Sequence, residues 1–182
     1  DLMELGDNYL TGRALDNRIG GFTIAQVARI LSKYDDLPFK LYIVNSVQEE
    51  IGLRGAGMVA KRIKPDVAFV CDVCHETTSP PYNAQKEGLF VAGEGGVLTV
   101  APAVQNNLLD MIRDVAEDND IPYQMAASST STGTDTDAFA YHGDGSTAAA
   151  LMSFPLKYMH TTVEMVHRND VDSVIDTMVE FL

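Results

Sequence analysis

Five residues with metal-binding or acid–base chemistry lie near the ends of predicted strands: Asp16, Glu49, Glu50, Asp72 and His160. Carboxylates combined with an imidazole suit zinc, cobalt or manganese, and paired ions of this kind activate water in hydrolases. In open α/β sheets, ligands gather outside the carboxyl ends of the strands. We therefore expect these side chains to meet at one edge of a sheet. A two-metal site also needs a second histidine, for which the sequence offers no good candidate.

Glu49 and Glu50 are adjacent, and neighbouring residues on a strand point to opposite faces. They can serve one cavity only if the backbone turns, which Gly52 and Gly55 favour. One carboxylate could then bind metal while the other acts as a general base toward water. A solvated acidic loop is the simpler interpretation of this pair taken alone. A glycosidase is a further alternative, although adjacent residues seldom hold two carboxyls at the ~5–9 Å that it requires.

The other three candidates each have an ordinary structural interpretation. Asp16 precedes a predicted helix, where an aspartate is more often an N-cap than a ligand. Asp72 could be a turn residue, and His160 could be a surface histidine. Their shared position at the ends of predicted strands is the stronger indication, because it would bring all of them to the same edge.

The hydrophobic pattern alternates between strands and helices along the whole chain. We expect strands at 9–14, 39–47, 67–73, 122–127 and 148–154, and helices at 17–33, 55–63, 104–118, 135–142 and 171–182. Asp16 or Asn17 is expected to cap the first helix, and Asn169 or Asp170 the last. The stretch 75–96 reads mainly as loop, with a short strand expected at 89–92. This pattern predicts a single α/β domain, a three-layer sandwich whose mostly parallel sheet carries helices on both faces.

Length and charge set the outer limits on function. The 182 residues fit one domain with a real core. A formal net charge of -13 argues against nucleic acid or an anionic membrane as a partner. No apolar run is long enough to span a bilayer. The chain begins without Met, which indicates a fragment or a processed chain.

Two cysteines occur in the run Cys71-Asp72-Val73-Cys74-His75, which matches the pattern of covalent haem attachment. The apolar residues before and within this run favour a buried strand instead, and buried free cysteines are common. Haem attachment also needs a helical environment, which the α/β pattern does not provide. Two reduced cysteines are typical of a cytoplasmic protein.

Several blocks of the chain resemble, in the same order, one known family of enzymes. They are similar to the glutamyl aminopeptidase and tetrahedral aminopeptidase family of co-catalytic metallopeptidases, some members of which are named endoglucanase or deblocking aminopeptidase. The most specific blocks are Gln-Glu-Glu-x-Gly-x-Arg-Gly, which begins at Gln48, and Tyr-Met-His, which ends at His160. The matching blocks are 14–21, 46–56, 70–75, 133–135 and 154–164.

The resemblance implies a role for each candidate residue. Asp16 would bridge both metals, and Glu49 would be the general base. Glu50 and His160 would be terminal ligands of one metal, and Asp72 a ligand of the other. The loop 133–135 would line the substrate side of the cleft. The implied activity is removal of N-terminal residues from peptides by a metal-activated water. The implied cofactors are two divalent ions, zinc or cobalt, and the implied parent is a cytoplasmic homo-oligomer.

The chain also departs from this family. Its members begin with a segment that carries a His-x-Asp ligand motif, followed by an inserted β-barrel-like domain. Neither is present in residues 1–182, and His75, His142 and His167 do not lie in such a motif. We therefore expect the C-terminal portion of a peptidase domain, which binds metal weakly or with partial occupancy, holds only one ion, and is a poor peptidase alone. The alternative is a non-catalytic α/β module that binds a metal, or a partner through an unpaired sheet edge.

Overall fold

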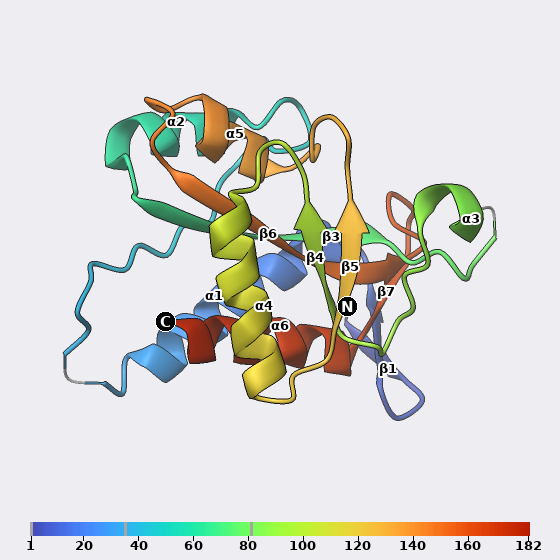
Figure 1. Ribbon diagram of the computed structural model, residues 1–182. Coiled ribbons are helices and arrows are strands. Elements are labelled where there is room, and N and C mark those ends of the chain that lie inside the picture. The colour runs from blue at the N-terminus through green and yellow to red at the C-terminus, as the bar shows by residue number, and fades with distance from the viewer. Residues whose placement is uncertain (1, 35, 81) are drawn as a thin grey trace.

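The computed structural model describes residues 2–34, 36–80 and 82–182, and it contains one open sheet flanked by helices (Figure 1). The strands are β1 (Met3–Leu5), β2 (Tyr9–Gly12), β3 (Val67–His75), β4 (Gly96–Val100), β5 (Tyr123–Ala127), β6 (Ala148–Lys157) and β7 (Glu164–His167). The helices are α1 (Leu15–Leu31), α2 (Arg54–Ile63), α3 (Ala84–Glu87), α4 (Asn106–Asp118), α5 (Asp135–Tyr141) and α6 (Arg168–Phe181). The strand order is β1-β2-β7-β6-β4-β5, and β3 also pairs with β6.

The predicted α/β class is confirmed, and the sheet is mixed in its strand directions. Within the described residues, β3 runs parallel to β6 and β4 runs parallel to β5. The pairings β1–β2, β2–β7, β4–β6 and β6–β7 are antiparallel. Short connections explain the pairs β1–β2 and β6–β7, because two adjacent strands joined by a brief turn run antiparallel.

Helices cover both faces of the sheet (Figure 1). Helices α1, α4 and α6 pack together on one side, and α2 packs on α5 on the other. Strand β6 lies between them and is buried along nearly its whole length. Its residues Met152, Phe154 and Leu156 have no exposed surface, as expected for a strand covered on both faces. This strand therefore forms the centre of the hydrophobic core.

The ends of two helices show which polar residues cap them. In α1, Asp16 and Asn17 have non-helical backbone angles, and Asn17 Oδ1 accepts a hydrogen bond from the Gly20 amide at 2.9 Å. Asn17 thus does the capping, which leaves the Asp16 carboxylate free for other contacts. At α6 the capping prediction is wrong, because the His167 side chain accepts from the Asn169 amide at 3.2 Å.

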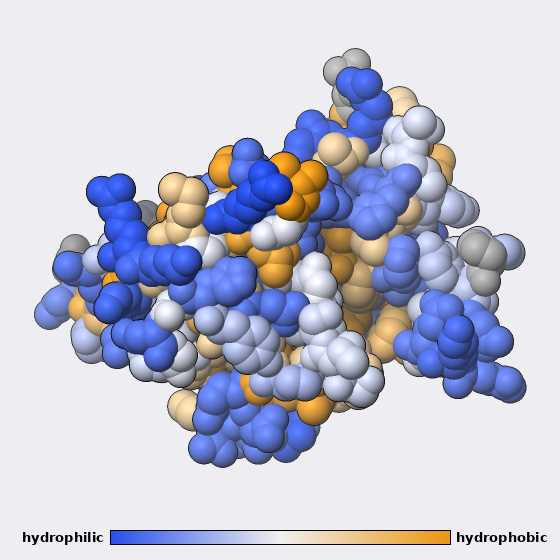
Figure 2. Space-filling view, turned by 90° about the horizontal axis from the view of Figure 1, so that it is seen from above, coloured by the Kyte–Doolittle hydropathy of each residue, from blue (hydrophilic) through white to orange (hydrophobic). Residues whose placement is uncertain are grey.

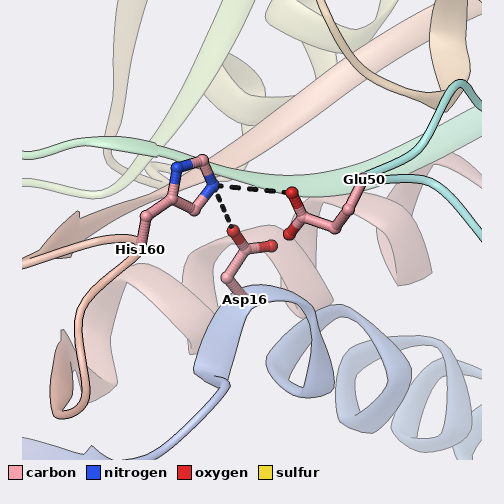
Figure 3. Close-up of side chains that lie close together, drawn as sticks. All are labelled: Asp16, Glu50 and His160. Carbon is pink, nitrogen blue, oxygen red and sulfur yellow. Dashed lines mark ion pairs between the residues drawn. The ribbon is translucent and has the colours of Figure 1, made fainter.

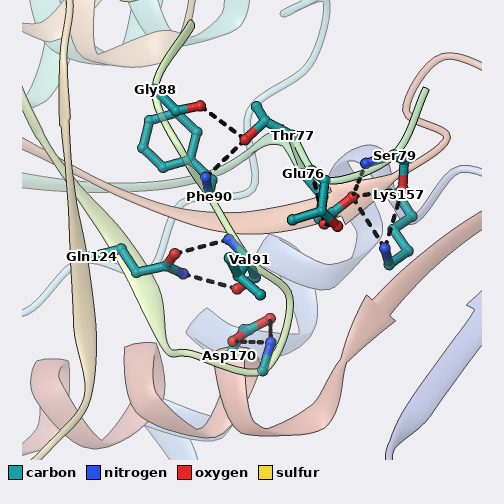
Figure 4. A network of polar contacts seen from close by, with 11 residues as sticks. Glu76, Thr77, Ser79, Gly88, Phe90, Val91, Gln124, Lys157 and Asp170 are labelled. Atoms are coloured by element: carbon teal, nitrogen blue, oxygen red, sulfur yellow. Dashed lines mark hydrogen bonds and ion pairs between the residues drawn. The ribbon is translucent and has the colours of Figure 1, made fainter. Parts of the chain in front are cut away.

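Two strand predictions are also wrong, and three strands, β1, β4 and β7, were not predicted. Residues 39–47 form no strand, and neither do residues 89–92. In residues 89–92 one side chain takes the place of a neighbouring strand, because Gln124 hydrogen-bonds both the amide and the carbonyl of Val91 (Figure 4). The segment 39–47 instead faces a cavity of about 1210 Å³ that separates it from β3. Strands β4 and β7 are short, and their apolar patterns gave no clear signal.

Cys71 lies within β3, as predicted, and so does Cys74, because β3 extends two residues beyond the predicted end at residue 73; both are free thiols. Burial raises the pKa of each thiol to about 12. Such thiols are poor nucleophiles and fit a structural role in the core. No helix in the described ranges is long and apolar enough to cross a membrane.

Candidate metal centre

Three of the predicted ligands converge at one point of the structure (Figure 3). Asp16 comes from the start of α1, Glu50 from the loop before α2, and His160 from the loop after β6. His160 Nε2 lies 3.1 Å from Asp16 Oδ2 and 3.7 Å from Glu50 Oε2. One donor atom from each residue lies within 4.8 Å of the other two. Residues separated by up to 144 positions therefore meet as a possible ligand set.

The donor geometry fits a divalent cation. Donors around a tetrahedral zinc ion, with bonds of ~2.0 Å, lie ~3.3 Å from one another. The two measured separations, 3.1 and 3.7 Å, bracket that value. Two carboxylates and one imidazole also match the ligand types of catalytic zinc sites, which keep an open position for water. Asp16, Glu50 and His160 can therefore hold one ion with little movement.

The turn at 47–55 explains how two adjacent glutamates serve one site. The Glu49 carbonyl accepts the amides of Gly52 and Leu53, both at 2.9 Å. Gly52 has a φ of +117°, which strongly favours glycine. At Gly55 a Cβ atom would lie 2.4 Å from the Val47 carbonyl oxygen, so only glycine fits there. The predicted backbone turn is confirmed, and both of its glycines are needed.

Asp72 lies on the same side of the sheet but in a different environment. It sits inside β3, before the end of that strand, because β3 pairs with β6 as far as His75. Its side chain is buried, and Asp72 Oδ1 accepts hydrogen bonds from Asn17 Nδ2 at 3.0 Å and from the Val73 amide at 2.8 Å. It is not one of the three converging donors. A second ion at Asp72 would thus need further ligands.

The carboxylates of the site repel one another. Burial, with the charge of Glu50 as the second cause, raises the pKa of Asp16 to about 6 and that of Glu49 to about 7. Burial also raises the pKa of Asp72 to about 8, against the opposing hydrogen bond from Val73. Across the described ranges, no Lys or Arg forms an ion pair with Asp16, Glu49 or Asp72. A cluster of this kind is suited to a bound cation.

This cluster makes the stability of the metal-free chain depend on pH. A carboxyl group with a raised folded-state pKa stabilises the fold below its unfolded pKa of ~4. That contribution is lost as the pH rises through the folded values, which run from about 6 to about 8. We expect the Tm in EDTA to fall by roughly 5 °C or more between pH 5 and pH 9. Asp72→Asn should reduce this fall, and a Tm that rises over the range would contradict the prediction.

Three residues near the site had no predicted ligand or catalytic role. The Glu164 carboxylate accepts hydrogen bonds from the backbone of Asp16 and of His160. Asp135 accepts a hydrogen bond from Ser46, and its second carboxylate oxygen is buried without a partner in the described structure. The His75 ring lies 6.4 Å from that of His160. Only the four-residue spacing from His160 to Glu164 is visible as a local sequence signal.

A small cavity of about 380 Å³ opens beside the site. Its lining includes Glu49 and Glu50 on one side and Gly133 and Asp137 on the other. The loop 132–134 is held in place by Asp137, which accepts the amides of Thr132 and Gly133. The loop 133–135 thus lies beside the acidic site, and this cavity is the candidate cleft for substrate.

Known proteins share the sequence pattern and the fold of this chain. Residues 1–177 match the family described as M42 glutamyl aminopeptidase. The lysyl aminopeptidase of Pyrococcus furiosus is 36% identical over 161 residues, which are 88% of this chain and 44% of that protein. The aminopeptidase APDkam598 from the archaeon Desulfurococcus kamchatkensis superposes with a TM-score of 0.89 at 30% identity. That match covers 100% of this chain and 51% of the other.

A third relative, the Pyrococcus horikoshii TET1 peptidase, superposes with a TM-score of 0.82 at 27% identity, over 99% of this chain and 52% of that one. That protein can assemble into a tetrahedron or a large octahedral shell. The chain spans about half the length of the curated relatives it matches. On the match of its residues 1–177, the chain belongs to the M42 glutamyl aminopeptidase family.

Proposed function

We propose that this chain carries most of the catalytic site of a metal-dependent aminopeptidase, which removes N-terminal residues from peptides. The observation that carries the proposal is the convergence of Asp16, Glu50 and His160, with Glu49 on the same turn as Glu50. Membership of an aminopeptidase family supports the same activity. A non-catalytic metal-binding module would account for the three ligands, but it gives no role to Glu49, which lies beside them without being one of the converging donors.

The residues divide the chemistry between them. Asp16, Glu50 and His160 would hold one divalent ion, and Asp16 and Asp72 would contribute to a second. Zinc and cobalt both suit these donors. When bound, such ions supply Lewis acidity and lower the pKa of water. Glu49 lines both cavities next to the ligands without being one of the converging donors. Its carboxylate would take the proton of the attacking water and pass it to the leaving amine.

We also propose that residues 1–182 form the C-terminal portion of a larger peptidase domain, and that further strands fill the cavity beside β3. We call this cavity the slot, bounded by residues 67–72 of β3 and by the segment 39–46. Among the described residues β3 pairs only with β6, so the backbone groups on its slot side have no ladder partner. An unpaired edge of this length is a template for another strand.

The walls of the slot are apolar as well as unpaired. Phe39, Tyr42, Ile43 and Val67 are 38–50% exposed, which is unusual for four large apolar side chains lining one cavity. Figure 2 shows apolar side chains exposed in hollows between hydrophilic ones. The relatives are about twice as long as this chain, so they contain sequence that could supply such strands. The same sequence is our proposed source of the second histidine.

We extend the proposal to assembly and location. The TET1 peptidase forms large closed shells, and we propose that the complete protein is likewise a homo-oligomer. We propose a cytoplasmic location, where its two free cysteines would stay reduced. The substrate would be a peptide with a free N-terminus.

Hydrolysis assays on the complete protein test the proposed activity. Lysyl, leucyl and glutamyl p-nitroanilides should be cleaved, and phenanthroline should lower the rate at least ~10²-fold. Added zinc or cobalt should restore it. Carboxymethyl-cellulose, tested in parallel, should not be hydrolysed. Activity that survives complete metal removal would refute the proposal, and hydrolysis of cellulose alone would favour the glycosidase.

A further inference from the structure

Glu164, the first residue of β7, holds two of the three converging ligands by their backbones. Its Oε2 accepts a hydrogen bond from the Asp16 amide at 3.0 Å, and its Oε1 accepts one from the His160 amide at 3.0 Å. The residue is only 2% exposed. One buried carboxylate therefore connects the segment before α1 to the loop after β6.

Neither ligand is held by regular secondary structure. Asp16 lies two residues after Ala14, whose φ is +50°, and has non-helical backbone angles itself. His160 has a φ of +62°, in the loop between β6 and β7. Amides in such segments lack a helix or ladder acceptor and need another partner. Glu164 provides the acceptor for both.

The sheet fixes the position of Glu164 itself. Strands β2 and β7 pair antiparallel, and Gly12 lies opposite Glu164 in their register. The chain leaves β2 at that point and reaches Asp16 four residues later. The carboxylate is thus carried by a rigid element, while the two residues it holds lie on irregular backbone.

We propose that Glu164 is a positioning residue that sets the separation of Asp16 and His160 for metal binding. The inference rests on the proposed function only in treating these two residues as ligands. Both oxygens are needed, because each accepts one of the two amides. Loss of either bond would let one ligand drift relative to the other. Outer residues that orient metal ligands typically contribute 10–100-fold in metal affinity.

Asp170 offers a matched control, because its carboxylate also accepts hydrogen bonds from two backbone amides but lies away from the site. It is fully buried and accepts the amides of Gly93 and Gly95 at 2.9–3.0 Å (Figure 4). It anchors the loop before β4 and none of the converging ligands. If the role of Glu164 were purely structural, substitutions at Glu164 and at Asp170 would have the same effect on zinc affinity.

The experiment compares Glu164→Gln with Asp170→Asn in the complete protein. Each replaces one carboxylate oxygen by an NH₂ group, which cannot accept from an amide. Zinc affinity is measured by competition with a chromophoric chelator, and ligand geometry by the visible spectrum of the cobalt-loaded protein. We expect Glu164→Gln to weaken zinc binding ~10–100-fold and to alter the cobalt spectrum. Asp170→Asn should stay within about twofold of the parent protein, as for a distant independent site.

A second variant, Glu164→Asp, and a hydrogen-exchange measurement separate the positioning role from the alternatives. Glu164→Asp keeps the charge but is one methylene shorter, so it should weaken zinc binding as Gln does. If Glu164→Asp kept the full zinc affinity, charge alone would matter and the proposal would be overturned. Parent-like zinc binding by Glu164→Gln would also overturn it. Hydrogen exchange of the Asp16 and His160 amides should speed up in Glu164→Gln and not in Asp170→Asn. If the parent protein binds no zinc, the proposed function fails, while this exchange measurement still decides whether Glu164 holds both segments.

Discussion

Replacing Glu49 with Gln in the complete protein is expected to lower kcat for aminoacyl anilides by ~10²–10⁴-fold while bound metal is retained. Glu49 stands beside the converging donors and is not one of them. The amide keeps the size of the side chain but cannot take a proton. The measurement combines steady-state kinetics with the metal content of the same preparation. Loss of metal, or unchanged turnover, would contradict the assignment of Glu49 as general base.

Glu50→Gln is the matched control for this experiment. It is the same substitution on the same turn, and both residues line the small cavity. Glu50 Oε2 lies 3.7 Å from His160 Nε2 and is a proposed metal ligand. We therefore expect this variant to lose metal first and activity as a consequence. If both variants kept their metal, or both lost it, the general-base role and the ligand role could not be divided between Glu49 and Glu50.

The parts of the fold that could be predicted are those whose pattern lies within a short stretch of the sequence. β6 appears as a continuous apolar run because both of its faces are covered, and β3 is also largely apolar although it is covered less completely. Helix α4, expected at 104–118, forms at Asn106–Asp118 with Leu108, Leu109 and Ile112 buried. The turn after Glu49 was predictable from Gly52 and Gly55. In each case the residues that determine the structure are neighbours in the sequence.

The rest depends on contacts between distant segments. Residues 39–47 have the composition of a strand, yet a strand forms only when another strand pairs with it. Glu164 holds Asp16 across 148 positions, a relation that no local spacing reveals. The convergence of Asp16, Glu50 and His160 was expected from predicted strand ends. Their measured separations could come only from the folded chain. The catalytic and ligand roles of these residues stay predictions.

The slot connects the proposed additional strands with the proposed second metal ligand. Asp72 lies on the β3 wall of the slot, and Asp16 and Glu49 line its acidic end. A strand added to the free edge of β3 would run ~4.8 Å from it. Such a strand could bring a side chain to Asp72 that no residue on β6 can. Filling the slot and completing the second metal site are therefore expected to occur together.

Co-expression tests this coupling. The 182-residue chain alone should bind one zinc ion or less, because Asp16 and Asp72 give a second ion only two protein ligands. Supplying the remainder of the polypeptide in trans should raise the content to two ions and turnover by ~10²-fold or more. Ile43→Asp places a charge on the apolar slot wall and should prevent this gain. Met58→Asp, at an exposed apolar position on α2 outside the slot, should not.

The opposite result has a specific structural meaning. Two tight zinc sites and full turnover in the isolated 182-residue chain would show that one of its own residues completes the pair. His75 is the residue to examine, because its ring lies 6.4 Å from that of His160. Its Nδ1 atom is also buried without a hydrogen-bond partner in the described structure. His75→Gln would then remove the second ion and leave the first. If the remainder of the polypeptide is needed instead, His75→Gln should leave the two-ion content of the complemented protein unchanged.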